Sequence, residues 1–270
     1  MAVFTHIRAA EDTRVSDALY RISREASGLW QTAPRFVARE SMTQRAAVTQ
    51  HKRSKPDAMV VQTREIVSYY SLGTLKGAPE ALREFRHIFI VDGIPIEDEK
   101  WALDEFRSEL QPRDDPARRA LIENFEKRCL ASAATDFGQL LLLFTRTNLP
   151  KYDFGLAGEA RIGDDQAWRI AFTQKTGTES LHIFEAGAKR TDRLQGEVTV
   201  RQGDYLPLRI DLNDSHKHGE SEIRDEAKLA YMVVSGGLLP AALVYRRYVN
   251  NQLALESVYR YSDWQPLEKR

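Results

Sequence analysis

The sequence predicts an α+β fold: a large curved antiparallel sheet of about ten or eleven strands that forms an open half-barrel, with helices over its concave face. Three observations lead to this class. Residues 12–31 carry apolar side chains at helical spacing, residues 97–146 form an inserted helical block, and residues 151–264 alternate as strands with no helix between them. Such a run favours an antiparallel meander over a parallel α/β sheet. We therefore expect residues 1–270 to form a single domain.

Composition excludes several classes of protein. The chain of 270 residues carries 39 basic and 39 acidic side chains, and this balance argues against a nucleic-acid surface, which needs a basic excess. The single cysteine, Cys129, excludes an intrachain disulfide and a zinc site built on several thiolates. No apolar run is long enough to span a membrane, and no signal peptide is visible at the N-terminus. We expect neither a membrane span nor a cofactor.

The first helix has the clearest pattern. Its apolar side chains recur at spacings of four and three residues: Val15, Leu19, Ile22, Ala26 and Leu29. This spacing places them on one side of a helix over residues 12–31, which ends before Pro34. We expect the stripe to pack on the sheet.

Three strands are expected after this helix. They cover residues 36–49, 59–70 and 85–92. The third closes at Asp92-Gly93, which is a strong turn pair. Residues 72–84 are expected to be a connector with a helical turn after Pro79.

A short basic run lies in the polar turn at residues 52–57. It consists of Lys52, Arg53 and Lys55. Short runs of charge usually face water, so we expect a solvated loop here rather than a phosphate site.

The inserted block contains three expected helices. The first covers residues 97–110, and the second begins with Asp115 as N-cap and Pro116 in its first turn. Cys129 lies on the apolar face of the second helix, where an inert buried thiol is expected. The third, at 136–146, is a short helix whose leucines leave little polar surface, so we expect it to lie within the concavity.

After Pro150 the chain alternates apolar and polar residues and is almost all strand. About eight strands are expected, at 152–162, 168–172, 179–184, 196–201, 206–212, 222–234, 239–249 and 253–261. Gly, Asp and Asn turns join them. A long antiparallel meander tends to curl, and its concave apolar face then needs a cover.

Motifs that carry chemistry are weak in this sequence. No nucleophile elbow, zinc-protease motif, phosphate-binding loop or dinucleotide fingerprint is present. His216 and His218, with Asp214 and Glu220, form a pattern that can bind a metal, but solvated loop histidines are commoner. His87 and His182 fall within strands, where a hydrogen-bonded histidine is the usual case. We therefore assign no catalytic residue and no metal ligand.

Four stretches carry a layout that resembles a known family. They are "FIVDGIPI" at 89–96, "LLLLFTRTNLPKYDFGLAGEARIGDDQAWRIAF" at 140–172, "LQGEVTVRQGDYLPLRIDL" at 194–212 and "VYRRYVNNQLALESVYRYSDW" at 244–264. Together with the element order, they resemble the LolA/LolB-like lipoprotein carriers of the bacterial periplasm, which are half-barrels. The chain is also similar to uncharacterised bacterial envelope proteins of the same layout. No catalytic motif is shared.

The resemblance implies a hydrophobic pocket between sheet and helices that shelters a lipid or a lipoprotein acyl chain. The candidate lining residues are Leu141, Phe144, Phe154, Leu156, Trp168, Ile170, Phe172, Val198, Val200, Leu208, Ile210, Leu229, Tyr231, Leu243 and Tyr245. The same side chains can instead fill a dry core. Which face of each strand points inward follows from alternation, and a slip of one residue would reverse it.

Three functions remain open on the sequence. The favoured one is a non-catalytic binding protein of the bacterial cell envelope, which the resemblance places in the periplasm or outside the cell. The second is a protein-interaction or sensor module that presents the Tyr- and Arg-rich strands, including Tyr248 and Arg260, to an envelope protein partner. The third is a metal-dependent hydrolase that uses His216 and His218.

Overall fold

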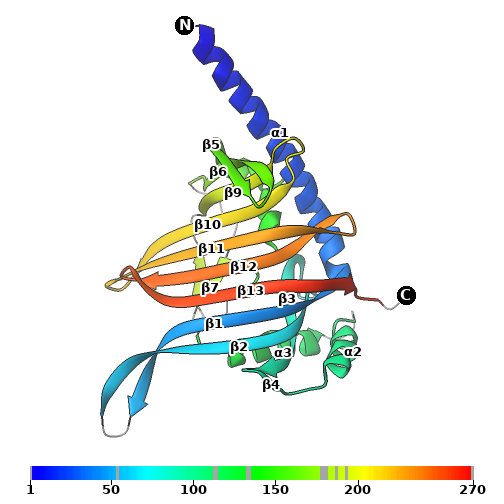
Figure 1. Ribbon diagram of the computed structural model, residues 1–270, viewed down its shortest axis with the longest axis vertical. Coiled ribbons are helices and arrows are strands. Elements are labelled where there is room, and N and C mark those ends of the chain that lie inside the picture. Colours follow the sequence, from blue (N-terminus) through cyan, green and yellow to red (C-terminus); the bar gives the residue numbers. More distant parts are fainter. Residues whose placement is uncertain are drawn as a thin grey trace.

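The structure is a computed structural model, and it describes residues 2–52, 55–111, 115–131, 135–176, 182–185, 188–191 and 194–268 (Figure 1). Side chains are described for residues 13–48, 59–111, 115–131, 135–176 and 194–268. Within these ranges, no helix combines the length and the apolar character that crossing a bilayer requires.

An antiparallel sheet of eleven strands dominates the molecule, in the order β4-β3-β2-β1-β13-β12-β11-β10-β9-β6-β5. Its strands are β1 (Phe36–Lys52), β2 (Lys55–Leu75), β3 (Ala78–Val91), β4 (Ile94–Pro95), β5 (Tyr152–Ile162), β6 (Asp165–Gln174), β9 (Gln195–Arg201), β10 (Pro207–His218), β11 (Ser221–Val234), β12 (Gly237–Val249) and β13 (Gln252–Pro266). Because β1 pairs with β13 as well as β2, strands from both ends of the chain lie side by side (Figure 1). The sheet is curved and stays open between β4 and β5, which confirms the predicted fold class.

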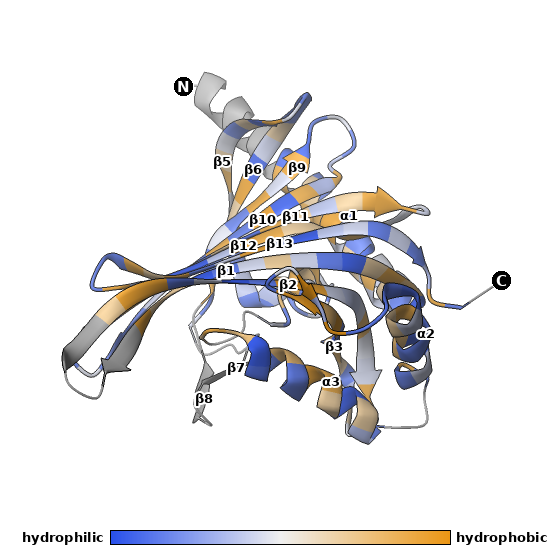
Figure 2. Ribbon diagram, turned by 60° about the horizontal axis from the view of Figure 1, so that its bottom comes forward, coloured by the Kyte–Doolittle hydropathy of each residue, from blue (hydrophilic) through white to orange (hydrophobic). Residues whose placement is uncertain are grey.

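Hydropathy alternates along the central strands, as the sequence pattern indicates (Figure 2). One face of the sheet carries the main hydrophobic core. The opposite face carries mainly charged and polar residues, such as the cross-strand row formed by Glu226, Arg246 and Glu256. This alternation sets which side chains face the concave interior.

Two expectations about strands are wrong. Residues 72–84 are not a connector, because β2 runs to Leu75 and β3 starts at Ala78, leaving a turn of two residues. β4 pairs with β3 only at Ile90 and Val91, so one side of β3 is a sheet edge at its start. Pro79 is tolerated there because a backbone N–H facing that edge would have no strand to donate to. The strand expected at 179–184 also differs: β7 (His182–Glu185) pairs with β8 (Ala188–Thr191) in a separate sheet, and 179–181 lie outside the described residues.

The helices differ from prediction mainly in their bounds. α1 (Ala2–Thr32) begins ten residues before the predicted start at residue 12. α2 (Glu99–Glu109) and α3 (Asp115–Arg128) lie in the inserted block as expected. The segment expected as a helix at 136–146 is instead the single 3-10 turn η2 (Leu140–Phe144), because the backbone is already extended at Thr145.

The inserted block covers both faces of the sheet rather than the concave face alone. Phe125 of α3 and the leucines of η2 join the concave core. α2 packs on the other face, where Ala102 and Phe106 contact a second apolar cluster that contains Tyr69 and Phe89. Alternation explains this arrangement, because Tyr70, which follows Tyr69, and Ile88, which precedes Phe89, point into the concave core.

Polar contacts fasten the block to the sheet. His87 on β3 contacts two carboxylates, with Nδ1 2.7 Å from Glu109 of α2 and Nε2 2.8 Å from Glu97. Burial lowers the pKa of His87, but its hydrogen bonds to the carboxylates of Glu109 and Glu97 outweigh this and raise the pKa overall. The carboxylate of Asp115 accepts from the backbone N–H of Lys76 in the β2–β3 turn at 3.0 Å, so it ties α3 to the sheet.

Gly196 on β9 tests the packing of the meander. A Cβ there would collide with the Asp211 carbonyl oxygen and lie 3.0 Å from the Phe172 ring. We expect Gly196→Ala to lower the free energy of unfolding by about 1–3 kcal/mol through overpacking. Gly155 on β5 has no atom within 4 Å of the same position, so Gly155→Ala is the matched control and should be close to neutral. Equal denaturation midpoints for the two variants would contradict the packing described.

Candidate ligand-binding interior

A continuous row of apolar side chains crosses ten strands of the concave face. In register order it consists of Leu156, Ile170, Val198, Ile210, Leu229, Leu243, Tyr259, Met42, Ile66 and Val91. Each member lies directly opposite the next, where cross-strand pairs stabilise a sheet. The row is almost fully buried in its middle and half-buried at its two ends, on β5 and β3.

The cover over the β5–β12 part of this face comes from α1 and η2. α1 contributes four fully buried side chains, those of Ala18, Ile22, Ala26 and Leu29. Ile22, Ala26 and Leu29 belong to the stripe predicted from helical spacing, whereas Ala18 was not part of it. η2 contributes Leu140, Leu141, Leu143 and Phe144. The ring of Phe144 meets that of Phe172 edge-on, with 5.0 Å between centroids.

The predicted lining residues lie on this face, with one partial exception. Eleven of them are buried: Leu141, Phe144, Ile170, Phe172, Val198, Val200, Ile210, Leu229, Tyr231, Leu243 and Tyr245. Phe154, Leu156 and Trp168 are half-buried and pack against the same core. Leu208 is half-buried next to an irregularity in the β9–β10 register and is not part of that core.

The interior meets solvent at its β5 end. Here Val15 and Leu19 of α1 face the sheet with only partial burial, as do Phe154, Leu156 and Trp168 of β5 and β6. The guanidinium of Arg14 lies 4.8 Å from the centroid of the Trp168 ring. A cation–aromatic contact between two partly exposed side chains contributes little stability, so this end is the least firmly closed part of the cover.

The opposite part of the cover is held by hydrogen bonds to a buried amide. Gln44 of β1 is fully buried, and its Oε1 accepts from the backbone N–H of Leu130 at 2.6 Å and of Ala131 at 3.3 Å. Its Nε2 donates to Ser257 of β13 at 3.2 Å. The end of α3 is thereby bonded to the middle of the sheet.

Glu84 of β3 forms a second attachment point. Its carboxylate accepts from the backbone N–H groups of Asp136 and Gly138, both at 2.7 Å, and from the Tyr70 hydroxyl at 2.9 Å. A Cβ at Gly138 would collide with that hydroxyl, so the close approach needs glycine. The chain that leads into η2 is therefore fixed on the sheet at residues 136–138.

A buried ion-pair network supports Glu84. Arg86 contacts Glu84 at 2.9 Å and Glu40 at 2.8 Å, and all three side chains are at most 1% exposed. Burial lowers the pKa of Arg86, but Glu40 and Glu84 outweigh this and hold the pKa well above its usual value. The guanidinium also lies 4.3 Å from the centroid of the Phe125 ring. This network is structural, since its charges are paired with one another inside the core.

Sequence reasoning missed these polar residues. Their signal is a polar side chain at the inward position of an apolar alternation: Glu40 and Gln44 alternate with Ala38, Met42 and Ala46. Their bonding partners come from segments distant in the chain, so the sequence alone does not pair them.

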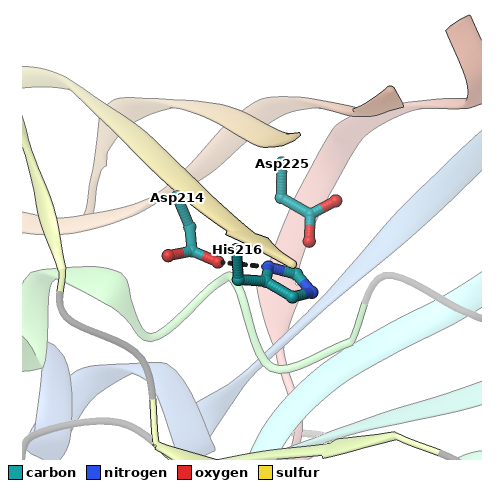
Figure 3. Close-up of side chains that lie close together, drawn as sticks. All are labelled: Asp214, His216 and Asp225. Carbon is teal, nitrogen blue, oxygen red and sulfur yellow. Dashed lines mark hydrogen bonds and ion pairs between the residues drawn. The ribbon is translucent and has the colours of Figure 1, made fainter. Parts of the chain in front are cut away.

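The predicted His216/His218 motif is not in a loop, because β10 continues through His218. Asp214, His216 and Asp225 come together on the concave side, near the end of β10 and the start of β11, with ligand atoms within 4.8 Å of one another (Figure 3). His218 is not part of this group. Asp225 joins it because the register places it opposite Asp214.

This group is bonded as an ion-pair network. Asp225 accepts from Arg247 at 2.8 and 2.9 Å and from the Tyr245 hydroxyl at 2.9 Å. His216 Nδ1 lies 3.0 Å from Asp214. A cation bound here would have to displace Arg247 from its two-bond contact, so we assign no metal site.

The Tyr- and Arg-rich strands divide their side chains between the two faces. Tyr245, Tyr259 and Tyr261 belong to the buried core. Tyr248 faces outward and is half-buried under Arg224, whose guanidinium lies 4.0 Å from the centroid of its ring. Arg260 is exposed. His87 is hydrogen-bonded as expected, and the side chain of His182 lies outside the described residues.

No protein-family model and no curated protein sequence matches the chain. Among solved structures, it is similar to a DUF1329 family protein from Desulfovibrio piger, at 13% identity, covering 93% of this chain and 92% of that one, with a TM-score of 0.38. It is also similar to an outer membrane lipoprotein-sorting protein domain from Vibrio parahaemolyticus, at 10% identity, covering 91% and 90%, with a TM-score of 0.35. Similarity this low does not argue for a shared function, so the proposal below rests on geometry.

Asp136 gives the attachment at Glu84 a dependence on pH. Burial and the neighbouring Glu84 raise the pKa of Asp136 from 3.8 to about 6. Between these two pH values the folded chain keeps a proton on Asp136 that the unfolded chain has lost. The stabilisation that this proton gives the folded chain is complete below pH 3.8 and is lost as pH rises through about 6. We expect the stability of the wild type, relative to Asp136→Asn, to fall between about pH 4 and pH 7. Denaturant unfolding at a series of pH values measures this, and a constant difference would contradict it.

Cys129 is expected to be unreactive in the folded protein. Burial raises the pKa of its thiol to about 12, so almost no thiolate exists at neutral pH. A chromogenic disulfide reagent should label it only after denaturant is added. Labelling of the native protein at the rate of the unfolded chain would show that the thiol is not protected.

Proposed function

We propose that the chain forms a single domain that acts as a non-catalytic carrier. In this proposal, a lipid or another acyl-chain ligand binds between the concave face of β5–β12 and the cover formed by α1 and η2. The observation that carries the proposal is the apolar row across ten strands, closed at its β5 end only by half-buried side chains. The bacterial cell envelope, in the periplasm or outside the cell, is the setting proposed for this activity.

The two parts of the cover differ in how they are held. The segment from Leu130 to Gly138 is bonded to Gln44 and Glu84. α1 contacts the interior through apolar side chains, while Ser27 bonds to Ser23 and Arg21 pairs with Glu25 within the helix. Apolar contact has no directional requirement, so a ligand chain can replace the helix side chains that it displaces.

The energetic argument for a ligand is the burial of apolar surface. Lifting α1 exposes the apolar row, and an acyl chain that covers it recovers roughly 25 cal/mol per Å². An uncharged chain needs no polar partner along the row from Leu156 to Leu243, whose members are all apolar. The half-buried Leu156, Phe154 and Trp168 are the side chains that such a chain would meet first.

The test is the ligand content and ligand affinity of the protein. Native mass spectrometry of freshly purified protein should show bound lipid, and a fluorescent long-chain fatty acid should bind with saturation. Leu156→Asn places an amide in the apolar entrance and should weaken binding about tenfold, because a bound acyl chain would cover the amide without offering it a hydrogen-bond partner. Val244→Asn lies on the outer face, opposite Lys228 and Val258, and is the matched control.

Circular dichroism melting would confirm that both variants fold. An apo mass together with no binding of the fatty acid would show that the interior is a dry core. Equal affinities for Leu156→Asn and the wild type would place the ligand elsewhere.

A further inference from the structure

We propose that the free end of the β1–β2 hairpin docks on an anionic lipid surface. This end, called the arm below, consists of residues 47–52 and 55–63. The inference does not rest on the proposed carrier function, because a protein with a dry core could use the same arm. It rests on three features of the arm: missing lateral partners, exposed apolar side chains and local basic charge.

The arm has no strand beside it within the described residues. β13 pairs with β1 only as far as Ala46, and β3 pairs with β2 only as far as Ile66. The β1–β2 register continues past both points to Lys52 opposite Lys55. Figure 1 shows the hairpin projecting from the body of the sheet. A two-stranded ribbon is marginally stable in water by itself, so contact with another surface would stabilise it.

Two apolar side chains of the arm are strongly exposed. Met59 and Val61 lie two residues apart on one face of the ribbon, and each is 67% exposed. Ala47 is opposite Val61, and the next pair, Val48 with Val60, lies on the other face of the ribbon. Exposed apolar side chains at the end of a projecting element can enter the interfacial region of a bilayer without bringing the sheet into contact with it.

The charge of the arm selects the kind of surface. Residues 47–52 and 55–63 contain two lysines, Lys52 and Lys55, against one acidic residue, Asp57. Lys52 and Lys55 share one register position at the end of the ribbon. The whole chain has no net charge, so the rest of the chain is slightly acidic and the arm is basic relative to it. Basic residues beside exposed apolar ones favour anionic lipid over neutral lipid.

A second exposed apolar cluster lacks this combination. Ile94, Ile96 and Trp101 are 68%, 42% and 54% exposed. They lie within residues 92–105, which carry six carboxylates and one lysine. An anionic surface would repel this segment, so the arm is the better match.

Vesicle binding of the full chain tests the proposal. The probes are vesicles of phosphatidylcholine alone and of an equal mixture of phosphatidylcholine and phosphatidylglycerol, measured by co-sedimentation. We expect binding to the mixed vesicles only, and weaker binding at high salt. The double variants Lys52→Gln/Lys55→Gln and Met59→Ser/Val61→Ser should each lower the partition coefficient about tenfold.

Matched controls remove the same groups from the body of the sheet. They are Lys217→Gln/Lys228→Gln, at exposed lysines, and Met232→Ser/Val233→Ser, at side chains that are 41% and 56% exposed. Both controls should bind like the wild type.

Three results would overturn the proposal. The first is no binding of the wild type to either vesicle, and the second is equal binding by the arm variants and the wild type. The third is a change of oligomeric state in the Met59/Val61 variant, measured by light scattering without vesicles, because it would show that the arm contacts a second copy of the chain.

Discussion

The buried carboxylate of Glu84 determines where the cover of the sheet begins. It accepts hydrogen bonds from two backbone N–H groups of the 136–138 segment, and Arg86 supplies the opposite charge. Burying a carboxylate is costly unless its charge is paired and its oxygens are hydrogen-bonded. The bonds to Glu84 are therefore coupled, since losing any one of them leaves part of a buried charge without a partner. This coupling fixes the chain that enters η2 relative to β3.

The concave face is divided into two parts by this arrangement. Polar groups on β1, β2, β3 and β13 lock the cover through Gln44, Glu84 and the Arg86 network. The strands from β5 to β12 present apolar side chains to α1 and η2. Opening the first part would break several charge-assisted bonds, whereas opening the second exposes apolar surface that a ligand can cover again. In the carrier proposal, α1 is therefore the part that moves, and the segment bonded to Gln44 and Glu84 is the part that stays fixed.

Local patterns predict this fold well where a single periodicity decides the structure. The stripe of α1 and the alternation of β9 to β13 follow from residue spacing, and both were expected. The tight turn between β2 and β3 was not predicted, because Gly73, Gly77 and Pro79 are typical of a longer loop. Pairing of the two strands along their length overrides that local preference. The bonds of Gln44 and Glu84 join segments far apart in sequence, so only the folded chain brings the partners together.

Hydrogen exchange tests the division of the cover most directly. The account predicts that amides of α1 after residue 13 exchange well before those of β1 and β13, and that saturation with a long-chain fatty acid slows α1 selectively. The amides of Asp136 and Gly138, which bond to Glu84, should remain protected in both states. Protection of α1 equal to that of β1, unchanged by the fatty acid, would contradict the claim that α1 is the opening part of the cover.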